Sequence, residues 1–140
     1  MMQTYLLSLL YLFFGAAFLL ADGYGVRFPM LLSLRYHFRT KRWVRVTLII
    51  FGLGITLLLA LFPMEPGPVL LGDLIPLLNV LSLAFYYLYL SLKNTEEEGP
   101  NDNSVLHATG LYVEHNRRGV GYVTLAVALI HFFIPHFVLI

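Results

Sequence analysis

The stretch YLLSLLYLFFGAAFLLA, residues 5–21, contains no charged residue and decides the fold class. A helix needs roughly 20 apolar residues to cross a hydrocarbon core about 30 Å thick. Three further apolar runs follow, at about residues 44–62, 74–92 and 120–140. Backbone that faces lipid must satisfy its own hydrogen bonds, and these runs lack the alternation of β-barrel strands. We therefore expect an all-α integral membrane protein, a single domain of four transmembrane helices over residues 1–140.

The composition also points to a membrane. Of the 140 residues, 59% are hydrophobic and only 12% are charged, and the mean hydropathy is +0.76. A soluble domain usually carries about twice this charged fraction. The net charge of +1 argues against a nucleic-acid-binding protein, which would carry a basic excess over one face. The absence of cysteine excludes disulfides, thiolate zinc sites and iron–sulfur clusters, and no cofactor-binding motif is visible, so no cofactor is predicted.

The first apolar run could also be a cleaved signal peptide. Residues 1–4 contain no Lys or Arg, and Leu19 stands where cleavage after Ala21 would require a small residue. Both observations favour retention of this run as a membrane helix.

Basic residues are unevenly distributed among the connecting segments. The first segment and its end contain Arg27, Arg35, Arg39, Lys41, Arg42 and Arg45. The second segment, residues 63–73, contains none, and the third contains Lys93, Arg117 and Arg118. Because Lys and Arg stay on the cytoplasmic side, this predicts a multi-pass protein of the cell (inner) membrane with both termini outside. Trp43, Tyr86, Tyr87 and Tyr89 would then form an aromatic belt at the inner interface.

Residues 28–45 have an amphipathic pattern. Leu31, Leu34 and Phe38 lie near one helical face. One interpretation is a helix on the inner surface that binds anionic lipid headgroups through Arg35, Arg39, Arg42 and Arg45. The other, which we favour, is a basic anchor that only fixes orientation.

The remaining segments are polar or rich in turn-forming residues. Residues 63–68 predict a tight outer hairpin, and residues 94–104 predict a flexible cytoplasmic loop. Residues 105–118 contain His107, Glu114 and His115, but a metal site would need more ligands at closer spacing. We expect no metal there and a solvated or interfacial segment instead.

Polar residues within the last two predicted helices are the main candidates for a ligand or proton site. They are Asp73, Asn79, His131 and His136. Buried polar residues are costly in a membrane and therefore point to function. At about 1.5 Å per residue, His136 and Asp73 share an outer level, and His131 and Asn79 share a deeper one.

Pro135 strengthens the case for His131. Proline has no N–H, so the carbonyl of His131, four residues earlier, loses its helical donor. Each candidate also has a structural interpretation. Asp73 suits a helix N-cap, Asn79 an interhelical hydrogen bond and His136 the headgroup region, and His131 suits a buried, hydrogen-bonded structural group. These structural interpretations are favoured over a functional site.

Three functions remain open. The first is a non-enzymatic subunit of a membrane transport or envelope complex, or a homo-oligomer, with small residues such as Gly52 and Gly54 at packing seams. The second is a membrane enzyme acting on a lipid or quinone at the outer leaflet. The third is an ion or proton conductor using His131. The expected partners are the bilayer, anionic headgroups at its inner surface, and other subunits or further copies of the chain, but no nucleic acid.

Overall fold

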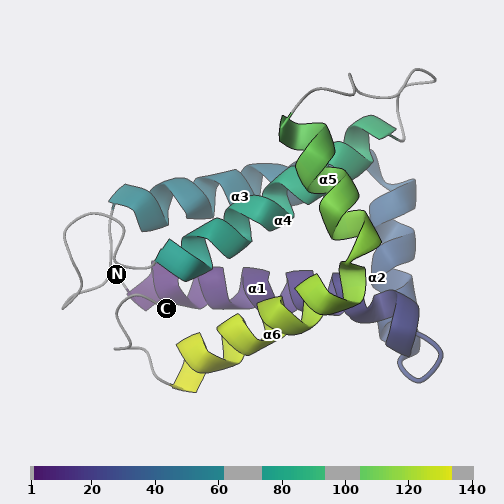
Figure 1. Cartoon of the computed structure of the whole chain (residues 1–140), viewed down its shortest axis with the longest axis horizontal. Helices are drawn as coiled ribbons and strands as arrows, with labels where there is room; N and C mark the ends of the chain where they lie inside the picture. Colours follow the sequence, from purple (N-terminus) through teal and green to yellow (C-terminus); the bar gives the residue numbers. More distant parts are fainter. Residues whose placement is uncertain (1, 62–73, 94–104, 134–140) are drawn as a thin grey trace.

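The computed structural model describes residues 2–61, 74–93 and 105–133, and every regular element in these residues is an α-helix (Figure 1). The helices are α1 (Met2–Tyr24), α2 (Pro29–Thr40), α3 (Arg42–Leu61), α4 (Leu74–Lys93), α5 (Val105–His115) and α6 (Arg117–Phe133). Within the described residues, three helical stretches are long and apolar enough to cross a membrane: Gln3–Tyr24, Arg42–Leu61 and Leu74–Lys93. The all-α prediction is confirmed. The end of the fourth predicted span, residues 134–140, and the predicted loops at 62–73 and 94–104 lie outside the described residues.

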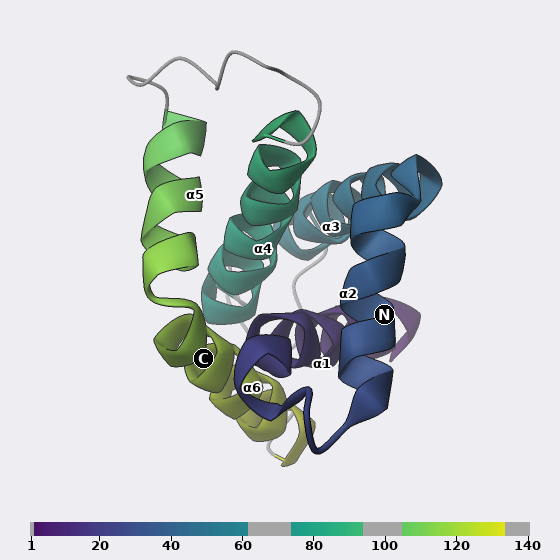
Figure 2. The same ribbon diagram turned by 90° about the vertical axis from the view of Figure 1, so that its right-hand side faces the viewer.

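The four long helices form two pairs, and the two short helices cross one end of them. α1 packs along α6, and α3 packs along α4. Figure 2 looks onto the end where α1 and α4 finish and where α3 and α6 begin. There α2 runs from the α1 side to the α3 side, and α5 runs from the α4 side to the α6 side. This is the end that the distribution of Lys and Arg predicts to face the cytoplasm.

Helix α1 is central to the packing, because it contacts α2, α3, α4 and α6 and makes the most extensive contact of the fold, with α6. Half of the most apolar stretch of α1 is buried, whereas only 22% of the corresponding stretch of α3 is buried. The difference leaves one side of α3 as an exposed apolar face. This face includes Ile50, Phe51, Leu53, Leu57 and Leu61. Such a surface is suited to lipid or to another membrane helix.

An aromatic cluster fills the core near the crossed end. Phe18 of α1 lies 5.3 Å from Tyr87 of α4, and Phe38 of α2 lies 5.3 Å from the same ring. Tyr86 and Tyr89 are also buried. The expected aromatic belt is therefore wrong for the three tyrosines, because α2 and α5 cover this end of α4. Trp43, in contrast, is fully on the surface at the start of α3.

Glycine allows two especially close approaches between helices. A Cβ at Gly52 of α3 would collide with the Tyr11 hydroxyl of α1, which donates a hydrogen bond to the Leu48 carbonyl at 3.1 Å. A Cβ at Gly110 of α5 would collide with the ring of Tyr89. Gly54 has open space around it, so only the first of the two glycines predicted in α3 is at an internal packing seam.

Two segments differ from the sequence prediction. The expected amphipathic helix over 28–45 is interrupted at Lys41, where the backbone is extended (φ −104°, ψ 108°), so that α2 ends and α3 begins there. Residues 105–115 form α5, a helix that the sequence did not predict, and the interfacial position expected for them stays a prediction. Its Gly110 and Val113 are buried. Gly110 lets α5 pack closely on α4. The sequence of this segment lacks strong periodicity and therefore did not predict the helix.

Candidate functional site

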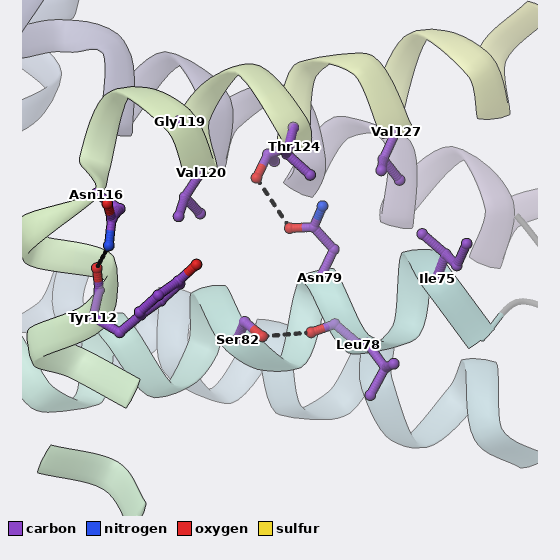
Figure 3. A pocket seen from close by; sticks show the side chains of 11 residues that line it. Ile75, Leu78, Asn79, Ser82, Tyr112, Asn116, Gly119, Val120, Thr124 and Val127 are labelled. Atoms are coloured by element: carbon purple, nitrogen blue, oxygen red, sulfur yellow. Dashed lines mark hydrogen bonds between the residues drawn. The ribbon is translucent and has the colours of Figure 1, made fainter. Parts of the chain in front are cut away.

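The polar interior of α4 and α6 is organised around Asn79 and Thr124. The Thr124 hydroxyl donates a hydrogen bond to Oδ1 of Asn79 at 3.0 Å, and Thr124 is completely buried (Figure 3). The pair borders a largely apolar groove of about 520 Å³ between the two helices. Ser82, also in this groove, bonds the Leu78 carbonyl of its own helix at 2.8 Å. The polar groups of the groove are therefore used mainly within and between the helices.

His131 lies on the buried side of α6 and faces α1. Its backbone carbonyl accepts a hydrogen bond of 2.6 Å from the Tyr5 hydroxyl, and the two rings lie 4.8 Å apart between centroids. Pro135 has no N–H to offer this carbonyl. Because α6 is described as far as Phe133, this carbonyl lies in the last described turn and has no donor within it, and the Tyr5 hydroxyl supplies one. Sequence reasoning identified the carbonyl that needs a donor, but it did not identify Tyr5.

Asn79 and His131 therefore have different neighbours. Thr124, the partner of Asn79, precedes His131 by two helical turns, about 10 Å along the axis of α6. Asn79 joins α4 to α6, and His131 joins α6 to α1. Asp73 and His136 lie outside the described residues. A single site formed by all four residues stays a prediction.

A second polar cluster lies at the crossed end of the bundle. Asp22, in the last turns of α1, forms an ion pair with Arg35 of α2 and another with Arg117 of α6, the latter at 2.7 Å. Glu114 of α5 pairs with Arg117 at 2.8 Å and with Lys93 of α4 at 3.0 Å. We call these five residues the inner charge cluster. It joins α1, α2, α4, α5 and α6.

The pKa values of Glu114 and Arg35 reflect this crowding. Burial alone would raise the pKa of Glu114, but the hydrogen bond from Lys93 and the charges of Lys93 and Arg117 outweigh burial and hold this pKa below its ordinary 4.5. Burial and then the charge of Arg117 lower the pKa of Arg35. The site thus stabilises an anion at Glu114 and disfavours the positive charge at Arg35.

Sequence reasoning did not assemble this cluster, although one signal was available. Asp22 is the only acidic residue among the first 64, and it directly precedes the most basic segment of the chain. A lone carboxylate beside so many cations predicts an ion pair. The partners Lys93, Glu114 and Arg117 come from distant segments, and local pattern does not identify them.

The four arginines considered for headgroup binding fall into two groups. Arg35 and Arg39 line a polar cavity beside the inner charge cluster. Arg42 is exposed next to Trp43, and Arg45 donates a hydrogen bond from Nη1 to the Arg39 carbonyl at 2.9 Å. The first pair is positioned to meet an anion together with Lys93 and Arg117.

Within residues 2–61, 74–93 and 105–133, no three His, Asp or Glu side chains come together as a metal site would require.

Comparison with other proteins adds the family and nothing about activity. No curated protein and no solved structure matches the chain. A protein-family model matches residues 1–131, which include α1 to α5 and α6 as far as His131. The match carries no description of function. The chain belongs to the family that this model defines.

Proposed function

We propose that the chain is a four-span protein of the inner membrane and a non-enzymatic subunit of a transport or envelope complex, or a homo-oligomer. Both termini lie outside, and the inner charge cluster faces the cytoplasm. α1, α3 and α4 are three of the spans, and α6 with the residues after it is the fourth. The excess of Lys and Arg in the first and third connecting segments supports this orientation.

One observation carries the proposal: polar groups inside the bundle bond one helix to another. The Tyr11 hydroxyl bonds the Leu48 carbonyl of α3. The Tyr5 hydroxyl bonds the His131 carbonyl, and the Thr124 hydroxyl bonds Asn79. In lipid such contacts hold helices together, because a polar group without a partner is costly there. This use of polarity is typical of a structural subunit.

The exposed face of α3 supports assembly with another membrane helix. It is the least covered of the three candidate spans, and Gly54 on it has nothing within 4 Å. A small residue on an outward face allows a second helix to approach closely. A surface that faces only lipid does not require a small residue.

The mass of the purified full chain in mild detergent, measured by native mass spectrometry, tests assembly. We expect species heavier than the 16.0 kDa chain, either multiples of it or complexes with a defined second subunit. Gly54→Leu should abolish the heavier species without disturbing the fold, because among the described residues no atom beyond the adjacent part of α3 lies within 4 Å of a Cβ at this site. Val123→Leu, on the exposed side of α6, is the matched control and should leave them intact. A wild-type chain that is monomeric in every mild detergent would contradict the proposal.

The orientation can be tested cleanly because the chain has no cysteine. Single-cysteine variants at Gln3 and Ile140 should react in intact cells with a membrane-impermeant maleimide. Variants at Lys41 and Arg118 should react only after the membrane is opened. Labelling of Ile140→Cys and Arg118→Cys on the same side would rule out the fourth span.

A further inference from the structure

A polar cavity of about 250 Å³ lies at the crossed end of the bundle, enclosed by elements that are far apart in the sequence. Figure 2 shows this end, with α2 and α5 on either side of the ends of α1, α4 and α6. The cavity has an apolar inner wall made by Phe18, Phe38 and Leu90. Its charged lining consists of Arg35, Arg39, Lys93, Glu114 and Arg117. The volume equals that of roughly eight water molecules in the liquid, which leaves room for a phosphate group and some water.

The charges around the cavity do not balance. Four cationic side chains line it, and three of them pair with two carboxylates, Glu114 in the lining and Asp22 outside it. Within the part of the chain that the structure describes, the guanidinium of Arg39 has no carboxylate partner. The described residues therefore leave two positive charges at one small cavity.

The fixed guanidinium groups make the cavity suitable for an oxyanion. Asp22 and Glu114 hold Arg35 and Arg117 in place, so little side-chain entropy is lost when these arginines bind a ligand. Nε of Arg117 is buried, and no hydrogen-bond acceptor for it lies among the described residues. Guanidinium groups match the geometry of phosphate oxygens, which accept several N–H donors at once.

We propose that this cavity binds a phosphate-bearing anion through Arg35, Arg39, Lys93 and Arg117. The phosphate belongs either to the headgroup of an anionic phospholipid or to free inorganic phosphate. A phospholipid as its source rests on the proposed membrane orientation, which would place the cavity at the inner headgroup level. The phosphate chemistry itself depends only on the described side chains.

The test measures affinity in detergent with the full chain and three probes. These are dihexanoyl phosphatidic acid, inorganic phosphate and, as a zwitterionic control, dihexanoyl phosphatidylcholine. We expect phosphatidic acid to bind more tightly than phosphatidylcholine. Arg39→Gln should weaken its binding about tenfold, since a charge-assisted hydrogen bond is lost. Arg42→Gln removes a charge that is also exposed but lies outside the cavity, and it should weaken binding less than about twofold.

The outcomes separate the two sources of phosphate. If Arg39→Gln weakens the binding of inorganic phosphate and of phosphatidic acid equally, free phosphate is sufficient as the ligand. Sensitivity of phosphatidic acid alone would support a lipid headgroup. Equal weakening by Arg39→Gln and Arg42→Gln, or no preference over phosphatidylcholine, would overturn the site.

Two further measurements keep the test independent of folding and of the proposed function. Arg39→Lys keeps the charge without the planar fork and should retain part of the affinity. If Arg39→Gln does not fold, two measurements still test the site. They are the affinity of Arg39→Lys and the competition of inorganic phosphate with phosphatidic acid on the wild-type chain. Binding in detergent needs neither a partner subunit nor a sided membrane, so a monomeric chain or a reversed topology would not remove it.

Discussion

The interior of the bundle and its crossed end are held together in different ways. In the interior, single hydroxyls bond backbone carbonyls and a glycine lets two helices touch, as at Tyr11 and Gly52. At the crossed end, ion pairs join five helices, but Asp22 keeps 41% and Lys93 50% of its side chain exposed. Exposed ion pairs are screened and add little stability, whereas close packing in lipid is sensitive to one added methyl. The interior thus determines the arrangement of the helices, and the crossed end holds charge that a ligand can use.

The largest effect is expected from Gly52→Ala, which tests the interior. The new methyl group collides with the Tyr11 hydroxyl and should destabilise the fold by about 1–3 kcal/mol. The measurement is the SDS fraction at which the protein unfolds in mixed micelles. Gly54→Ala, two residues away with nothing within 4 Å, should change it by less than about 0.5 kcal/mol. Equal effects of the two variants would mean that α1 and α3 do not meet at Gly52.

The next effect tests the crossed end. Arg117→Met removes two ion pairs, but Asp22 keeps Arg35 and Glu114 keeps Lys93. We therefore expect a loss of about 1–2 kcal/mol in the same unfolding assay, between the values for exposed and buried pairs. Arg118→Met is the control, because Arg118 is exposed and forms no ion pair within the described residues. A loss above that of Gly52→Ala would reverse the comparison.

Tyr5→Phe sharpens the comparison within the interior. The ring contact with His131 is kept, but the His131 carbonyl loses its donor. The expected cost is about 1 kcal/mol. Tyr11→Phe should cost less, because the Leu48 carbonyl lies inside α3 and still has a helical N–H donor. The reverse order in unfolding experiments would argue against the role given to Tyr5.

The smallest effect is a pH dependence confined to the crossed end. The pKa of Glu114 is lowered in the folded state, so its contribution to stability is complete above its ordinary value of 4.5. The contribution is lost as the pH falls through the lower folded-state value. Unfolding midpoints measured from pH 7 downward should therefore decline more steeply below about pH 4.5 in the wild-type chain than in Glu114→Gln. Parallel curves would show that Glu114 does not contribute.

The long apolar helices were predictable because the apolar character of a run depends on local sequence alone. A run such as residues 5–21 is apolar enough to be a helix in lipid whatever its neighbours are, and α1, α3 and α4 follow the predicted runs. The expectation that the His131 carbonyl needs a donor also came from local sequence, namely from Pro135 four residues later. Tyr87 was not, because a tyrosine near a helix end suits both an interfacial belt and a buried aromatic core. Only the position of α2 and α5 decides between them.

The candidate site was harder to predict from the sequence, because its contacts depend on tertiary structure. Asn79 was recognised as a polar group that needs a partner, but Thr124 lies on a helix 45 residues later in the chain. The inner charge cluster is still more dependent on tertiary structure, since Asp22 and Arg117 are 95 residues apart. Sequence pattern identifies residues that need partners, and the packing of helices selects the partners.

The hydrogen bond between Tyr5 and the carbonyl of His131 also has a consequence for biosynthesis. It joins residues separated by 126 positions, near the first and last parts of the described chain to be translated. At about 5–20 residues per second, a ribosome needs roughly 6–25 s to bridge that separation. During this interval α1 has no α6 to pack against, although α6 is its most extensive neighbour in the finished fold. The helix at the centre of the finished bundle is therefore the first to be made and among the last to be completed.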